Sequence, residues 1–110
     1  MKSALIHDLD ALRRQLAPHL GGARKVIVFG SVARGDADDW SDLDLLIIAD
    51  TTQPFLERYR DFEGLYGVWP RLDLLIYTPA ELAQMQAEGR PFIEHVLGEG
   101  VVIHEAPAER

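Results

Sequence analysis

The sequence predicts an α/β domain in which helices flank a small mixed β-sheet, and three observations predict it. Short apolar runs of strand length alternate along the chain with longer stretches of helical period. The connection between the first two runs is too short for a right-handed crossover helix, so we expect that pair of strands to be antiparallel. The 110 residues can build one core but not two, and we therefore expect a single domain over residues 1–110.

The composition limits the classes of protein to consider. Hydrophobic residues make up 47% and charged residues 26% of the chain, as in a soluble globular protein. The chain has no cysteine, which excludes a disulfide scaffold and a cysteine-ligated zinc site. No apolar run approaches the roughly 20 residues of a membrane span, and Asp8 and Asp10 interrupt the N-terminal apolar positions, which argues against a signal peptide. We expect a cytoplasmic protein with no membrane partner.

The chain is acidic, with eighteen acidic and eleven basic residues and a net charge of −7. Binding to a nucleic-acid backbone depends on lysine and arginine, so this charge argues against direct contact with nucleic acid. It favours metal ions and, through steering, a basic protein partner. The same charge is also typical of an acidic domain that is merely soluble, and composition alone leaves that alternative open.

The first half of the chain predicts a helix followed by two strands around a short turn. Ser3 can cap the helix, leucines recur along it at helical spacing, and Gly21 and Gly22 end it. The elements expected after it are a buried strand over residues 24–29, a short helix over 31–34, a polar loop over 36–41 and a second strand over 42–48.

The second half predicts three more helices and two more strands. Pro54 can open a helix that runs to about residue 65, and Pro70 stops the chain before the next strand. The elements expected after it are a strand over residues 72–77, a helix from Pro79 to Gly89, a short helix over 91–98, and a last strand over 101–104 at an edge of the sheet.

Two aspartates begin the predicted second strand, and a glycine–serine pair ends the first. Because side chains alternate along a strand, Asp42 and Asp44 share one face, with Cα atoms about 6–7 Å apart. Two carboxylates at the start of an otherwise buried strand cost free energy unless a cation neutralises them. Gly30 allows a sharp turn and the close approach of a phosphate, while the N–H groups that follow Ser31 can bind one. These residues predict a metal and phosphate site at one end of the sheet.

A third aspartate, Asp73, is the one charged residue in the apolar run of the predicted third strand. A third carboxylate from a neighbouring strand would complete a site for two divalent ions and could accept the proton of an attacking hydroxyl. The alternative is a structural aspartate that Arg71 or backbone N–H groups satisfy. We favour the metal role, because Asp73 occurs together with the other two aspartates and the glycine–serine turn.

The pattern Gly30-Ser31-x10-Asp42-x-Asp44 resembles the signature of the DNA polymerase beta-like nucleotidyltransferases, and in particular the minimal nucleotidyltransferases of bacteria and archaea. The resemblance extends over nearly the whole chain, including residues 72–79 and 92–97. It implies the fold of that superfamily and the binding of ATP as substrate with two Mg²⁺ ions. Gly30 and Ser31 would contact the triphosphate, and Asp42 and Asp44 would bind metal.

The same resemblance implies that Asp73 is the third catalytic and metal-binding carboxylate. Arg34 is a candidate phosphate contact, and Arg71 a candidate phosphate or partner contact, although solvated arginines explain both equally well. No base-reading residue is identifiable, so GTP, CTP and UTP stay open as alternatives to ATP. The chain carries four scattered histidines without ligand spacing, and Trp69 is expected to pack whereas Trp40 could stack on a base.

The resemblance also implies an enzymatic role in a toxin–antitoxin pair. Minimal nucleotidyltransferases of this kind are commonly encoded beside a HEPN-domain ribonuclease, and in type VII pairs they transfer AMP from ATP to a tyrosine hydroxyl of that toxin. Larger family members carry a helical acceptor domain, for which the 110 residues leave no room, so we expect the acceptor in a separate molecule. The expected function is therefore that of a protein adenylyltransferase and antitoxin that forms a hetero-oligomer with a HEPN toxin.

Two alternatives remain open. The chain could neutralise a toxin by forming a complex, without catalysis, or it could modify a small molecule such as an antibiotic at a site shared with a second subunit. The presence of all three aspartates favours the enzyme, because a protein that only binds its partner does not need them. Fold alone decides between none of these functions.

Overall fold

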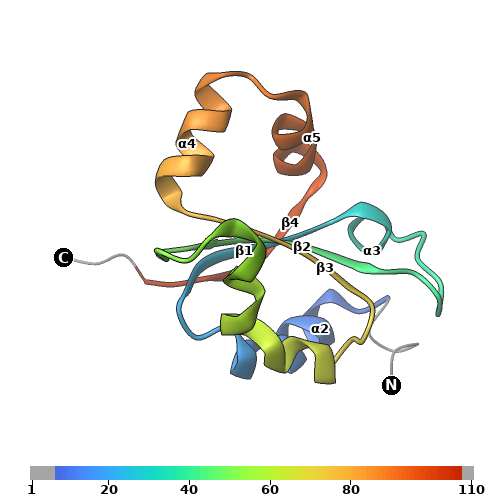
Figure 1. Ribbon diagram of the computed structural model, residues 1–110. Coiled ribbons are helices and arrows are strands. Elements are labelled where there is room, and N and C mark those ends of the chain that lie inside the picture. Colours follow the sequence, from blue (N-terminus) through green and yellow to red (C-terminus); the bar gives the residue numbers. More distant parts are fainter. Residues whose placement is uncertain (1–6, 108–110) are drawn as a thin grey trace.

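The computed structural model describes residues 7–107 and contains one four-stranded sheet with the strand order β3-β2-β1-β4 (Figure 1). Strand β1 is antiparallel to both of its neighbours, β2 and β4, while β2 and β3 are parallel. The sheet is therefore mixed, as predicted, and the last strand lies at an edge, as predicted. The strands are β1 (Ala23–Phe29), β2 (Leu43–Ala49), β3 (Leu72–Tyr77) and β4 (Val101–Glu105).

Helices cover both faces of the sheet, and one short helix lies at its end. In Figure 1, α4 and α5 lie above the sheet, and α2 and the green-to-yellow helix η2 lie below it. Helix α3 follows β1 directly and contacts β1 and β2. The helices are α2 (Leu9–Leu16), η1 (Ala17–His19), α3 (Gly30–Arg34), η2 (Phe55–Gly67), α4 (Pro79–Ala87) and α5 (Pro91–Glu99).

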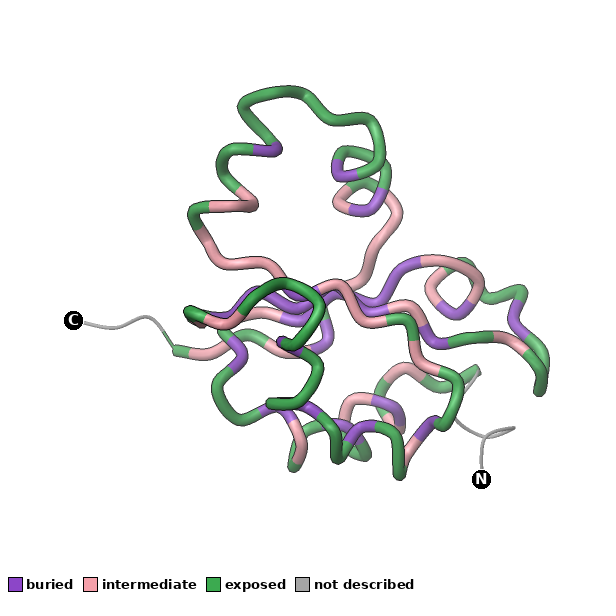
Figure 2. The backbone as a smooth tube through the Cα atoms, viewed as in Figure 1, coloured by how far each residue is buried: buried purple, intermediate pink, exposed green. Residues whose placement is uncertain are grey.

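The alternation of side chains along the strands builds a core on each face. On one face Val26 and Val28 of β1 pack with the buried residues of α2 and η2. On the other face Ile27 and Phe29 pack with Val96 of α5. The tube in Figure 2 is accordingly buried along most of the central strands β1 and β2, while β3 and β4 are mostly intermediate or exposed and most residues of α4 and η2 are exposed. Sequence periodicity predicted these two buried faces.

Two helices differ from the prediction. The first begins at Leu9 and is capped by Asp8, whose Oδ1 accepts a hydrogen bond from the Ala11 N–H at 3.0 Å, while Ser3 lies outside the described residues. The segment after Pro54 is a 3₁₀ helix, not an α-helix, and its backbone leaves helical geometry at Phe62, with φ −131°. Helical periodicity does not separate these two helix types when a kink interrupts the segment.

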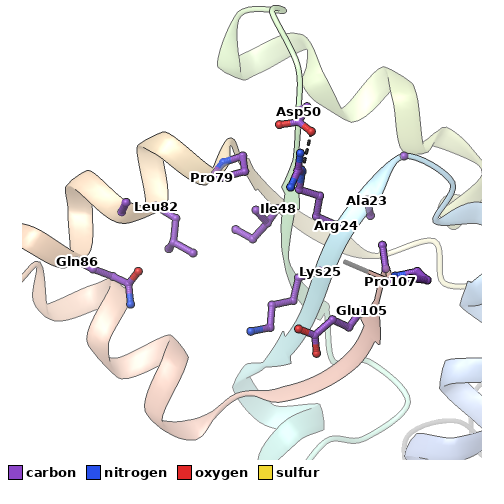
Figure 3. Close-up of a pocket in the computed structure, with 13 residues that line it drawn as sticks. Ala23, Arg24, Lys25, Ile48, Asp50, Pro79, Leu82, Gln86, Glu105 and Pro107 are labelled. Carbon is purple, nitrogen blue, oxygen red and sulfur yellow. Dashed lines mark hydrogen bonds and ion pairs between the residues drawn. The ribbon is translucent and has the colours of Figure 1, made fainter. Parts of the chain in front are cut away.

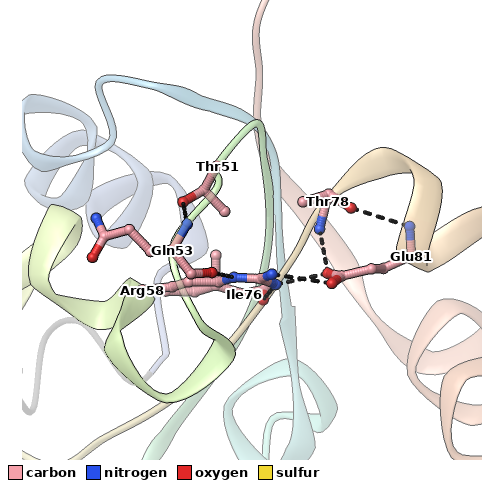
Figure 4. Close-up of polar contacts among 6 residues, drawn as sticks. All are labelled: Thr51, Gln53, Arg58, Ile76, Thr78 and Glu81. Atoms are coloured by element: carbon pink, nitrogen blue, oxygen red, sulfur yellow. Dashed lines mark hydrogen bonds and ion pairs between the residues drawn. The ribbon is translucent and has the colours of Figure 1, made fainter.

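A buried arginine of η2 forms hydrogen bonds with β3 and α4, and the sequence did not predict this contact. Arg58 Nη1 and Nη2 donate to Glu81 Oε1 and Oε2 at 2.6 and 3.0 Å, and Nη1 also donates to the Ile76 carbonyl at 2.9 Å (Figure 4). Glu81 and Thr78 form a capping box that starts α4. One guanidinium therefore fastens η2, β3 and α4 together at one end of the sheet.

Within residues 7–107, none of the helices combines the length and the apolar character that crossing a membrane requires.

Candidate functional site

The turn between β1 and α3 requires glycine for two separate reasons. Gly30 has φ +75°, a region that side chains rarely occupy. A Cβ atom at this position would lie 2.1 Å from Asp44 Oδ2 and 3.1 Å from Asp44 Cγ, far inside normal contact distances. Helix α3 then runs for one short turn and ends at Gly35, as predicted. The glycine therefore lets the chain pass directly beside a carboxylate.

The sheet register places two of the predicted aspartates side by side on neighbouring strands. Asp44 of β2 pairs with Phe29 on one side and with Asp73 of β3 on the other. Both aspartates point to the face that α4 and α5 cover, because Leu46 and Leu75, two residues further along each strand, contribute to the core on that face. Asp42 has the same parity but lies just before β2, which begins at Leu43 and not at Asp42.

The electrostatics of this cluster favour a bound cation. Burial above all, and then the negative charges of Asp73 and Asp42 and a hydrogen bond with Asp73, raise the pKa of Asp44 to about 6, although the charge of Arg34 acts in the opposite direction. A carboxyl group whose pKa is raised in this way ionises only at a cost in free energy. A divalent cation would remove that cost, and carboxylate oxygens are the ligands that Mg²⁺ prefers. The residues present therefore fit a magnesium site.

Asp42 forms an ion pair with Arg71. Its Oδ1 lies 3.1 Å from Arg71 Nε, and both side chains are about half exposed. Among the described residues no three histidine or acidic side chains already stand in an arrangement that could hold a metal ion. The sequence alternative paired Arg71 with Asp73, and the structure pairs it with Asp42 instead. The metal roles of Asp42, Asp44 and Asp73 stay predictions.

The loop before Asp42 is anchored by a buried tryptophan. The indole Nε1 of Trp69 donates to the Ser41 carbonyl at 3.2 Å, and the Trp69 side chain is fully buried. The packing role predicted for Trp69 is therefore confirmed. Trp40 is 76% exposed beside the same loop, which is compatible with the predicted stacking on a base but does not test it.

Glu99 is the site residue that sequence reasoning missed. Its Oε2 accepts a hydrogen bond from the Gly30 N–H at 2.8 Å, and its Oε1 lies 3.5 Å from Arg34 Nη1. Arg34 itself is exposed and divides its charge between Asp36 and Glu99. Because 69 positions separate Glu99 from Gly30, no local sequence pattern could have revealed this contact.

Of the predicted site residues, Asp73 lines one of the hollows beside the sheet. A hollow of about 240 Å³ lies between η2 and β3, and Asp73 lines it together with side chains that include Phe55, Tyr59 and Tyr66. A larger one, of about 790 Å³, lies between α4 and the opposite ends of the strands, where Arg24 and Asp50 form an ion pair (Figure 3). The larger hollow contains none of the predicted site residues.

Comparison with known proteins gives one family and several similar structures. The sequence profile described as "Polymerase beta, Nucleotidyltransferase" matches residues 15–109. A structure provisionally described as a minimal nucleotidyltransferase is 33% identical, with a TM-score of 0.60 over 86% of this chain and 94% of that one. A search of curated proteins gives no match.

Two further structures share the fold at lower identity. A toxin–antitoxin structure with AMP-PNP is 16% identical, with a TM-score of 0.60 over 90% of this chain and 74% of that one. A mutant of the toxin–antitoxin MntA–HpeT is 13% identical, with a TM-score of 0.56 over the same shares of the two chains.

Proposed function

We propose that this chain, which belongs to the polymerase beta nucleotidyltransferase family as one of its minimal members, transfers AMP from ATP to a tyrosine hydroxyl of a HEPN ribonuclease toxin and so acts as its antitoxin. One observation gives the main support for the proposed transfer of a nucleotide. Asp44 lies in register with Asp73 on one side and against the Gly30 turn on the other. The acidic cluster and the turn suited to phosphate therefore meet at a single point of the sheet.

Asp42, Asp44 and Asp73 are the residues that would hold two Mg²⁺ ions, and Asp42 has a second carboxylate oxygen that does not contact Arg71. When bound, such ions activate the attacking hydroxyl and neutralise the triphosphate. The raised pKa of Asp44 supports this assignment, because it reports a cluster with too much negative charge for its burial. The ions are also needed for charge balance, since ATP would bring further negative charge to the same place.

Other groups of the protein would receive the triphosphate and accept a proton. The Gly30–Ser31 turn gives the triphosphate room to approach the backbone, and Arg34 contributes a positive charge nearby. Asp73 is exposed on β3, so it can accept the proton of an incoming hydroxyl. The hydroxyl oxygen then bonds to the α-phosphorus, the bond to the pyrophosphate group breaks, and pyrophosphate leaves.

Three observations support a protein acceptor. A hollow on the η2 side of the edge strand β3, next to Asp73 but on the opposite face of the sheet from its side chain, is lined by aromatic side chains that suit an aromatic residue of a partner protein. The net charge of −7 suits a basic ribonuclease. Two proteins of the same fold are described as toxin–antitoxin structures, one of them with an ATP analogue. The HEPN identity of the toxin and the tyrosine target come from the family resemblance.

A second candidate function is inhibition by complex formation alone. Leu56 is 81% exposed on η2, close to the exposed aromatic residues Tyr59 and Tyr66, so this helix offers an apolar surface to a partner without any catalysis. In that case the three aspartates would have no role in neutralisation.

Intact mass spectrometry of the partner separates the two functions. The chain is incubated with the protein encoded beside it, ATP and Mg²⁺, and the double variant Asp42→Asn/Asp44→Asn serves as the control. The enzyme predicts mass gains in steps of about 329 Da, the mass added with each AMP group in a nucleotidyl transfer, and none with the variant. A partner of unchanged mass in a complex that survives the double substitution would establish inhibition by binding. Mass gain on an added aminoglycoside would instead favour the small-molecule alternative.

A further inference from the structure

The carboxylate of Glu99 connects the end of α5 to the turn between β1 and α3. The side chain is 17% exposed and turns toward the protein. Its Oε2 receives the Gly30 N–H at 2.8 Å, while its Oε1 lies 3.5 Å from both Arg34 Nη1 and His95 Nε2. One acidic group therefore joins the residue that opens the turn to a cation beside it.

Helix α5 has little to gain from an acidic residue at this position. The C-terminal end of a helix carries a partial negative charge, so a carboxylate there is disfavoured. The surrounding donors reverse the effect: the Gly30 N–H above all, and then His95 and Arg34, lower the pKa of Glu99. The physical reason for a carboxylate at this place thus lies in the turn that it contacts.

The end of α5 is firmly fixed against β1. A Cβ atom on Gly100 would lie 2.4 Å from Ile27 Cγ2 and 2.6 Å from the Val96 carbonyl oxygen, so only glycine permits this close approach. At the other end of α5, the ring of Phe92 meets that of Phe29 edge-on, with 5.9 Å between centroids. Glu99 therefore reaches Gly30 from a rigid support.

Gly30 is confined from a second direction as well. Its φ of +75° turns the position of a missing Cβ to within 2.1 Å of Asp44 Oδ2. Asp44 thus lies against the α-carbon while Glu99 holds the N–H group. Arg34 contacts Glu99, and its charge also lowers the pKa of Asp44. The turn and Arg34 share a contact with the Glu99 carboxylate, and Arg34 has a second contact with Asp36 at 3.3 Å.

We propose that Glu99 is a positioning residue of the nucleotide site, which holds the Gly30–Ser31 turn and Arg34 in the arrangement that receives the triphosphate. This inference rests on the proposed nucleotidyltransferase function. Glu99 acts through the reach of its oxygen to the Gly30 N–H, because a negative charge near a triphosphate would by itself weaken binding. A turn already held in its bound geometry loses less entropy when the nucleotide arrives.

Two substitutions of Glu99 separate the effect of its side-chain length from the effect of its negative charge. Glu99→Gln keeps an acceptor oxygen at the same distance and removes the charge, whereas Glu99→Asp keeps the charge and shortens the side chain by one methylene. We expect Glu99→Gln to change the Kd for AMP-PNP with Mg²⁺, measured by isothermal titration calorimetry, by less than about threefold. We expect Glu99→Asp to raise it about tenfold, the effect of losing one hydrogen bond to a charged acceptor. Glu94→Gln, at an exposed position of the same helix, should leave the Kd unchanged.

The results also separate this inference from the function on which it rests. A chain that binds AMP-PNP while Glu99→Asp binds it equally well would overturn the positioning role alone, as would a Glu99→Gln variant that is weakened as much as Glu99→Asp. Failure of the unaltered chain to bind AMP-PNP would overturn both claims. Amide hydrogen exchange of Gly30 in the unaltered chain gives a test that needs no variant: slow exchange is expected, and fast exchange in the folded protein would contradict the contact.

Discussion

At the scale of single residues, the close approach of Asp44 to Gly30 is the central feature of the candidate site. Asp44 Oδ2 occupies the space that any side chain at position 30 would need. The sequence alone could predict that Gly30 and Asp44 belong to one site, because two antiparallel strands joined by a short connection meet at one end. It could not predict the role of Glu99, which depends on where α5 ends in space, or the pairing of Arg71 with Asp42.

Replacing Gly30 by alanine should destabilise the protein and abolish transfer. The substitution combines an unfavourable positive φ with a steric overlap against Asp44, and we expect a loss of about 2–3 kcal/mol in the free energy of unfolding. Gly35→Ala is the matched control, because Gly35 has φ +84° but has open space around its Cβ position. It should cost only about 1 kcal/mol. Equal losses in chemical denaturation of the two variants would show that Asp44 does not crowd Gly30.

Replacing Asp44 by asparagine should have opposite effects on stability and on activity. Burial and neighbouring carboxylates make the Asp44 charge unfavourable in the metal-free protein. Removing that charge should therefore stabilise the metal-free protein at pH 7 by about 2 kcal/mol, while nucleotidyl transfer is lost. Thermal unfolding in EDTA measures the first effect. Asp42→Asn, at an exposed position, should change stability by less than about 0.5 kcal/mol. A destabilised Asp44→Asn variant would mean that Asp44 is a structural residue.

At the scale of secondary-structure elements, the strands were predictable from the sequence, whereas the contacts that fasten one helix to another were not. Apolar runs give strands within about one residue of those observed, since both faces of the sheet are covered. The 3₁₀ form of η2 and its attachment to α4 depend on a long-range pair, Arg58 with Glu81. In the sequence both residues look like ordinary charged residues of exposed helix faces. A buried guanidinium shows its importance only when the structure reveals which carbonyls and carboxylate surround it.

The bridge between Arg58 and Glu81 should make stability depend on acid pH. Hydrogen bonds from Arg58 and from the Thr78 backbone lower the pKa of Glu81 from 4.5 to about 2. The native state therefore favours ionised Glu81, and this contribution is complete above about pH 4.5 and is lost as the pH falls toward 2. Because the Glu81 side chain is 43% exposed, solvent screening limits the contribution to about 1 kcal/mol.

Comparison of Glu81→Gln with the unaltered chain measures this contribution. The variant should be less stable at pH 7 by about 1 kcal/mol, and the difference should narrow as the pH approaches 2. Glu63→Gln, at an exposed position of η2, controls for a general loss of negative charge. A difference between Glu81→Gln and the unaltered chain that does not change with pH would exclude the proposed role of the bridge.

At the scale of the whole molecule, the sheet separates two regions of different character. The predicted site residues gather where β1 ends and β2 begins, and the larger hollow lies at the opposite ends of the same strands. Sequence motifs identified the first region because they contain the residue types that the chemistry needs. They gave no sign of the second, which arises from the way α4 packs across the sheet. The largest hollow described and the site that the sequence motifs predict therefore lie at different ends of the sheet.

The central claim is that metal and nucleotide bind at the end of the sheet where Gly30, Asp44 and Asp73 meet. The most direct test is paramagnetic broadening of backbone amide signals in NMR spectra, with small amounts of Mn²⁺ in place of Mg²⁺ and AMP-PNP present. The account predicts that the signals of these three residues broaden first, that those of Arg24 and Asp50 beside the larger hollow do not, and that Asp44→Asn removes the effect. Broadening centred on Arg24 and Asp50, or unchanged by Asp44→Asn, would contradict it.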